Sequence, residues 1–161
     1  MEQSGRKFQM FRGINVINLD AKGRLGIPTR YRTLLQEEAN GRLVITIDTE
    51  EHCLLLYPLP AWKEIEQKIE SLPSFNRVTR RIQRLLIGHA TELELDSSGR
   101  ILLPSLLRDY AKLDKRVMLI GQGKKFEIWD EAKWNSGRST WLAEGLREDS
   151  GLPEQLLDLS L

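Results

Sequence analysis

Hydrophobic and polar positions follow the same order twice along this chain of 161 residues. Alternating apolar residues come first in each copy, with Ile17 and Leu19 in one and Leu93 and Leu95 in the other. Such alternation predicts a half-buried strand. A short strand, a helix opened by proline, two further strands and a closing helix follow in both copies. The pattern therefore predicts a mixed α+β fold made of two tandem units.

The predicted elements correspond pairwise in chain order. In the first copy they lie at 15–19, 24–27, 28–38, 42–47, 53–57 and 59–69, and in the second at 92–95, 100–103, 104–113, 116–120, 126–129 and around Trp134. Pro28 and Pro104 stand where a proline favours the start of a helix. A linking helix is predicted at 75–86, between the copies.

One motif carries the repeat most clearly. The chain reads NLDAKGRLGIP at 18–28 and ELDSSGRILLP at 94–104, so that five residues recur at an offset of 76. The matched pairs are Leu19 and Leu95, Asp20 and Asp96, Gly23 and Gly99, Arg24 and Arg100, and Pro28 and Pro104. A periodic match of this kind indicates a tandem duplication.

Each motif predicts a tight turn. Asp20 opens a type I turn in which its side chain accepts hydrogen bonds from backbone amides, and Gly23 closes it with a positive φ. Asp96 and Gly99 fit the same turn. The arginine that follows each glycine either pairs with the turn aspartate or extends into solvent.

Composition sets the outer limits of function. Since 40% of the residues are hydrophobic, a packed core is expected. The net charge of +1 does not by itself indicate a nucleic-acid-binding protein. Cys53 is the single cysteine, which excludes an internal disulfide. No apolar run approaches the ~18 residues of a membrane helix. These features predict a cytoplasmic protein.

Charge is distributed unevenly, and this is more informative than the sum. Residues 73–90 contain four arginines and no acid, whereas 142–161 contain five acids and Arg147. The two turns also differ. The first has Lys22 at its tip, whereas the second has serines at its tip and Glu92 and Glu94 on its outward strand positions. If a turn contacts nucleic acid, we expect it to be the first.

The D-x-x-G-R-x-x-x-P loop between short strands resembles the SpoVT-AbrB swapped-hairpin DNA-binding fold, and two tandem copies, beginning MFRG at Met10, resemble the bacterial MraZ family. The resemblance implies two double-psi, swapped-hairpin β-barrel repeats with flanking helices. It also implies a transcriptional regulator of the division and cell-wall gene cluster that binds G-rich promoter repeats, found in the cytoplasm and associated with the nucleoid. It further implies a ring-shaped homo-oligomer in which repeats of neighbouring protomers complete the fold.

The resemblance places its D-x-x-x-R signature on Asp20 and Arg24 and on Asp96 and Arg100. Arginine can donate two hydrogen bonds to guanine, whereas lysine and flanking arginines hold phosphates. The predicted DNA-binding residues are Arg24, Lys22, Asp20, Arg12, Arg30, Arg32, Arg100 and Asp96. Because one loop offers few base contacts, a ring of loops is expected to gain affinity by roughly 10²–10⁴ through multivalency.

The expected organisation has five parts. They are an N-terminal extension at 1–9, the first repeat at 10–72, a basic linker helix at 73–90, the second repeat at 91–141 and an acidic C-terminal tail at 142–161. The linker arginines 77, 80, 81 and 84 share one helical face. That face is either a solvated or intersubunit face that pairs with acids such as Glu37 and Glu38, or a face that contacts phosphate.

Other classes of function have weaker support. An antitoxin-type protein-interaction module that uses the acidic tail is the alternative to DNA binding. His52, Cys53 and His89 lack the spacing of a zinc site. We expect no metal, cofactor, small-molecule substrate or membrane partner, and the absence of catalytic motifs argues against an enzyme.

Overall fold

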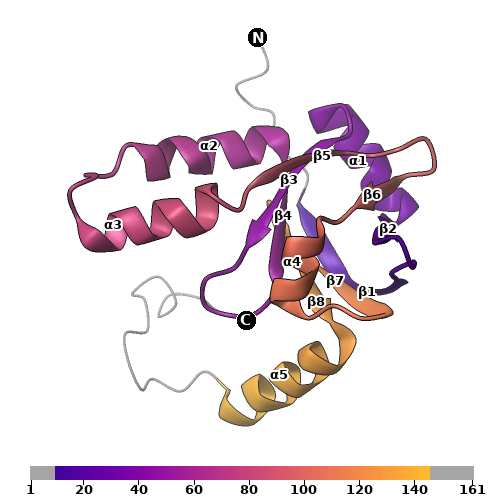
Figure 1. Cartoon of the computed structure of the whole chain (residues 1–161). Coiled ribbons are helices and arrows are strands. Elements are labelled where there is room, and N and C mark those ends of the chain that lie inside the picture. The colour runs from indigo at the N-terminus through magenta and orange to yellow at the C-terminus, as the bar shows by residue number, and fades with distance from the viewer. Residues whose placement is uncertain (1–9, 146–161) are drawn as a thin grey trace, which may run out of the picture. The chain divides into compact units, whose positions relative to one another are not determined.

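A computed structural model describes residues 10–145 of the chain (Figure 1). The chain divides after Glu131 into two compact units. The strands are β1 (Phe11–Asn18), β2 (Arg24–Gly26), β3 (Arg42–Ile47), β4 (Leu54–Pro58), β5 (Thr91–Glu94), β6 (Arg100–Leu102), β7 (Arg116–Gly123) and β8 (Phe126–Asp130). The helices are α1 (Thr29–Ala39), α2 (Leu59–Glu70), α3 (Arg77–Ile82), the π-helix η2 (Gln83–Ile87), α4 (Ser105–Ala111) and α5 (Glu131–Glu144).

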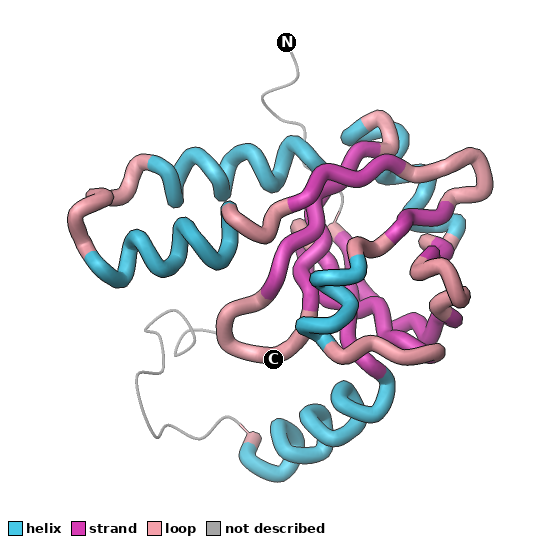
Figure 2. The backbone as a smooth tube through the Cα atoms, viewed as in Figure 1, coloured by secondary structure: helices cyan, strands magenta, loops and turns pink. Residues whose placement is uncertain are grey.

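Strands from the two repeats are interleaved. The larger sheet has the order β1-β7-β8-β4-β3-β5, and β2 and β6 form a separate two-stranded ribbon (Figure 2). β1 pairs with β7, β2 with β6, β3 with β5 and β4 with β8, so every strand of one repeat has a partner in the other. The α+β class and the two-repeat architecture are confirmed.

This pairing corrects one expectation. Repeats of neighbouring protomers were expected to complete the fold, but both repeats of the same chain do so. The duplication explains why, because each copy carries the apolar strands that its equivalent would otherwise recruit from a second molecule. Among residues 10–145, the ladders of the larger sheet leave β1 and β5 as unjoined edges rather than closing it into the expected barrel.

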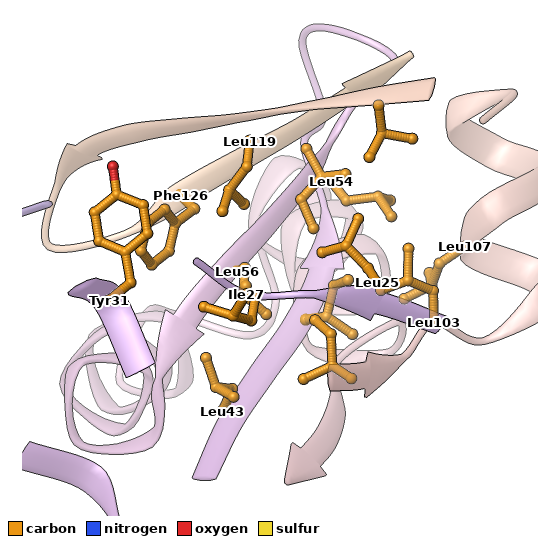
Figure 3. Close-up of a cluster of buried hydrophobic side chains, with 14 of the residues drawn as sticks. Leu25, Ile27, Tyr31, Leu43, Leu54, Leu56, Leu103, Leu107, Leu119 and Phe126 are labelled. Carbon is orange, nitrogen blue, oxygen red and sulfur yellow. The ribbon is translucent and has the colours of Figure 1, made fainter. Parts of the chain in front are cut away.

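The core is shared between the repeats. Leu25 and Ile101, at equivalent positions, are both almost fully buried, as are Ile27 and Leu103. Figure 3 shows side chains of both repeats meeting between the strands. A second cluster, Val44, Leu55, Tyr57 and Trp62, packs α2 against β3 and β4. Burial of the first cluster, to which both repeats contribute, joins their strands in one hydrophobic core.

The helix ends match the sequence signals. Pro28 and Pro104 immediately precede α1 and α4, and Asn40 and Lys112 end them with φ of 53°. The predicted linking helix is present as α3 followed by η2, and it lies beside α2 (Figure 1). In the second unit, α5 brings the rings of Trp134 and Trp141 into edge-to-face contact. Within the described range, every helix is too short or too polar to span a membrane.

Candidate nucleic-acid interface

The first turn is held by its aspartate. Asp20 Oδ1 accepts hydrogen bonds from the backbone amides of Lys22 at 2.9 Å and Arg24 at 2.8 Å. The Gly23 amide donates to the Asp20 carbonyl at 3.0 Å, and Gly23 has a φ of 88°. The hydrogen bond from the Arg24 amide is the main reason that the pKa of Asp20 is lowered. The predicted turn chemistry is confirmed.

The second turn repeats this geometry. Asp96 Oδ1 accepts from the amides of Ser98 at 2.8 Å and Arg100 at 2.9 Å, and Gly99 has a φ of 74°. The Arg100 amide likewise contributes most to lowering the pKa of Asp96. Both aspartates are therefore charged near neutral pH and shape the turns with their side chains.

The two turns belong to one surface. In the β2–β6 ribbon Arg24 lies opposite Leu102, Leu25 opposite Ile101 and Gly26 opposite Arg100. Leu25 and Ile101 are buried, so strand alternation places Arg24 and Arg100 together on the outer side. They are diagonal neighbours, a relation that corresponds to a separation of about 7–8 Å. We call the outer side of β2 and β6, with turns 20–23 and 96–99, the ribbon face.

Backbone hydrogen bonds tie each turn to the opposite repeat. The Ile27 amide donates to the Gly99 carbonyl at 2.9 Å, and the Leu103 amide donates to the Gly23 carbonyl at 2.9 Å. These bonds are equivalent under the repeat, since Ile27 and Leu103 differ by the offset of 76. The position of each turn is therefore fixed by the other copy.

Two arginines reinforce this arrangement. Arg32 Nε donates to the Ile27 carbonyl at 2.6 Å and its side chain covers Gly99, where an added Cβ would lie 2.3 Å from Arg32 Nε. Arg108 Nε donates to the Leu103 carbonyl at 3.1 Å and covers Gly23 in the same way. Arg32 was predicted to bind DNA, whereas Arg108 was not predicted to have a role. The repeat could have identified Arg108, because the two arginines match at the offset of 76.

The two signature arginines differ in their surroundings. Arg100 Nε lies 3.2 Å from Asp96 Oδ2 in an ion pair. Within residues 10–145, the Arg24 side chain makes no hydrogen bond or ion pair. The sequence left two outcomes open for these arginines. Arg100 pairs with its turn aspartate, whereas Arg24 extends outward. An exposed pair such as Arg100–Asp96 contributes little to stability, but it orients the Arg100 guanidinium toward Asp96.

Acidic residues of the second copy lie close to the first tip. Lys22, Glu92 and Glu94 line one surface hollow, together with Leu102 and Arg108. Glu92 also forms an ion pair with Arg42 on the neighbouring strand. The region around the ribbon face therefore carries both signs of charge.

Arg12 and Arg30 lie elsewhere. Arg30 donates to Asn15 Oδ1 at 3.0 Å and to the Tyr31 hydroxyl at 2.7 Å. Arg12 is exposed on β1, six residues before Asn18, which corresponds to ~20 Å along the strand. The structure brings Arg24, Lys22, Asp20, Arg100, Asp96 and Arg32 together at the ribbon face but does not bring Arg12 and Arg30 there.

The cysteine has acidic neighbours rather than histidines. Ligand atoms of Cys53, Asp48 and Glu127 lie within 4.8 Å of one another. Burial, followed by the charge of Glu127, raises the pKa of the Cys53 thiol far above its usual range. His89 Nδ1 lies 2.7 Å from the Leu85 carbonyl, away from this group. A raised pKa disfavours the thiolate, so Cys53 is a poor candidate for a nucleophile.

Comparison with known proteins places these features in a family. The family described as "MraZ protein, putative antitoxin-like" matches residues 10–85 and again 86–150. A protein of Coxiella burnetii called transcriptional regulator MraZ is 60% identical over 152 residues, covering 94% of this chain and all of that protein. Proteins of the same name from Legionella pneumophila and Halorhodospira halophila are 59% and 53% identical over the same lengths.

Proposed function

The chain belongs to the MraZ family, and from this premise we propose that it is a transcriptional regulator that binds promoter DNA through the ribbon face. Its relatives carry the name of a regulator rather than of an enzyme, which supports a regulatory role for this chain. The proposed site of action is DNA in the cytoplasm, at the nucleoid. The proposed target is a set of G-rich repeats upstream of division and cell-wall genes.

One observation carries the proposal: Arg24 stands on an outward ribbon with no side-chain partner among the described residues. A guanidinium so placed can donate two hydrogen bonds to O6 and N7 of guanine. A two-stranded β-ribbon is narrow enough to enter a major groove ~12 Å wide. The spacing of about 7–8 Å between Arg24 and Arg100 corresponds to roughly two base-pair steps, so both can address one groove.

The other predicted residues then take different roles. Lys22 sits at the exposed tip, where an ammonium can hold a phosphate. Asp20 and Asp96 shape the turns, and Arg32 braces one of them. Arg12 lies too far along β1 to join the same contact, and Arg30 of α1 is held by Asn15 of β1. We therefore propose a separate phosphate contact for Arg12.

One ribbon face makes too few base contacts for a specific operator. Each bidentate contact contributes about 1–3 kcal/mol, whereas specific sites require roughly 4–10 kcal/mol over non-specific DNA. We propose that a ring of protomers presents several ribbon faces to several DNA repeats, which makes later contacts intramolecular. A nearly neutral chain can then bind tightly because the contacts are multiplied.

The test compares Arg24→Ala and Arg100→Ala with Lys63→Ala, a control at an exposed position on α2. Fluorescence anisotropy would measure binding to the chain's own upstream DNA and to a scrambled fragment. We expect Arg24→Ala to weaken specific binding at least about tenfold, Arg100→Ala to weaken it less because its guanidinium is held by Asp96, and Lys63→Ala to leave it unchanged. Light scattering would confirm that all three variants assemble like the parent.

Two results would overturn parts of the proposal. If the Arg24→Ala variant assembles and binds DNA with unchanged affinity, the ribbon face does not recognise DNA. If a monomer binds the promoter as tightly as the parent, a ring is not needed for binding. The alternative, a protein-interaction module that uses the acidic tail, stays a prediction because residues 146–161 lie outside the described part of the chain.

A further inference from the structure

The linker arginines form a basic surface that the DNA-binding proposal does not use. Arg77, Arg80, Arg81 and Arg84 follow one another at helical spacing through α3 and η2, and all four are exposed. With Leu85 they line a surface hollow. Within residues 10–145 none of the four makes a side-chain hydrogen bond or ion pair, so pairing with Glu37 or Glu38 of the same chain is absent there. We call this surface the basic face.

The basic face and the ribbon face lie at different ends of the first unit. Figure 1 shows α3 at the left of the view, below α2, and β2 and β6 at the right. η2 is anchored to the larger sheet by the Thr46 hydroxyl, which donates to the Leu86 carbonyl at 2.7 Å. A DNA segment bound by the ribbon face of one protomer therefore does not extend over that protomer's basic face.

Exposed apolar side chains accompany the arginines. Leu72 and Phe75 lie in the loop between α2 and α3, and Val78 lies in the first turn of α3. The three side chains are 40%, 85% and 57% exposed. Phe75 directly precedes Asn76, which caps α3 by accepting hydrogen bonds from the amides of Val78 and Thr79. The DNA backbone offers phosphates to arginines but little to an exposed phenyl ring. A mixed basic and apolar surface instead fits a peptide that carries both carboxylates and aliphatic side chains.

The chain itself contains such a peptide. Residues 146–161 read LREDSGLPEQLLDLSL, with four acids, one arginine and six leucines. We propose that this segment docks on the basic face, with its carboxylates at the arginines and its leucines at Leu72, Phe75 and Val78. The charges are complementary, four positive against a net three negative. Sixteen residues span up to ~55 Å, several times the ~16 Å of an eleven-residue helix.

A photo-crosslinking experiment in the full-length chain tests this contact. Phe75 is replaced by p-benzoylphenylalanine, another aromatic residue, and crosslinked peptides are identified by mass spectrometry after irradiation. We expect the crosslinks to fall within 146–161, from the same chain or from another copy, and their yield to decrease with added salt. The charge reversal Arg80→Glu with Arg81→Glu should lower the yield about fivefold or more.

The reversal Lys63→Glu with Lys68→Glu on α2 is the matched control. It changes the net charge equally at exposed positions of the neighbouring helix and should leave the yield unchanged. Crosslinks that fall outside 146–161, or a yield that ignores the reversal on α3, would overturn the proposal. The proposal would also be overturned if the charge reversal on α3 weakened DNA binding while the crosslinks to 146–161 persisted. Nucleic acid would then be the partner of the arginines.

Discussion

Replacing Gly99 with alanine is expected to destabilise the whole fold through a contact between the two repeats. Gly99 has a φ of 74°, a conformation that costs an L-residue roughly 1–2 kcal/mol. The new Cβ would lie 2.3 Å from Arg32 Nε and 2.4 Å from Arg32 Cδ. The Arg32 side chain must therefore move, which strains or breaks its 2.6 Å hydrogen bond to the Ile27 carbonyl.

The magnitude follows from these two effects. A hydrogen bond from a charged donor contributes about 1.5–3 kcal/mol, and partial relaxation of the flexible arginine recovers some of it. Together with the backbone cost, Gly99→Ala should lower the free energy of unfolding by about 2–4 kcal/mol. For a chain of this size that corresponds to a decrease in Tm of roughly 5–15 °C.

Urea unfolding followed by circular dichroism measures the effect, with Gly26→Ala as the control. Gly26 lies in the same ribbon, but its added Cβ would be 3.9 Å from Arg100 Cγ, an ordinary contact. The control should change the free energy of unfolding by less than about 0.5 kcal/mol. In an Arg32→Ala background, Gly99→Ala should lower the free energy of unfolding only by the backbone cost of roughly 1–2 kcal/mol, because the arginine contact is already gone. Equal losses at Gly99 and Gly26, or a Gly99 cost that ignores Arg32, would refute the bracing role.

Three further outcomes are expected. The folded-state pKa values of Asp20 and Asp96 are lowered, so the two carboxylates stabilise the fold above the ordinary pKa of 3.8, and this stabilisation is lost as the pH falls through the folded pKa. Urea midpoints should therefore decrease below about pH 4, and replacing both aspartates with asparagine should make that decrease smaller. Tyr31→Phe keeps the ring but loses the hydroxyl bond to the Arg12 carbonyl, so the free energy of unfolding should decrease by about 1–2 kcal/mol in urea titrations, and an unchanged value would exclude that bond. Cys53 is buried with a raised pKa, so a thiol reagent at pH 8 should modify it only after urea is added, and rapid reaction of the folded protein would contradict its burial.

Local structure was largely readable from the residues. The turns at Asp20 and Asp96 formed as their spacing predicted, because an aspartate side chain and a positive-φ glycine act within five residues. Pro28 and Pro104 likewise precede helices, since their effect on φ and on the missing amide is local. The sequence motif also identified Arg24 as the residue to test.

The sequence did not predict which arginine would be free. Arg24 and Arg100 occupy equivalent motifs, yet only Arg100 pairs with its turn aspartate. Arg32 was assigned to DNA although its Nε is held by a carbonyl, because a basic residue near a loop gives no sign of a backbone partner. The basic face was predicted as a helical stripe, but the exposed apolar residues beside it became visible only in the folded chain.

By itself, the sequence determined the duplication, the turns, the helix starts and the α+β class. The turns and the helix starts were predictable because they depend on interactions between residues close together in the chain. Only the tertiary structure decided that the two repeats complete each other within one molecule and that Arg24 and Arg100 share a ribbon. The physical reason is that duplicated strands present equivalent apolar faces, so their patterns permit several pairings. Burial of one shared core then selects among those pairings, and residues that lie 76 positions apart become neighbours.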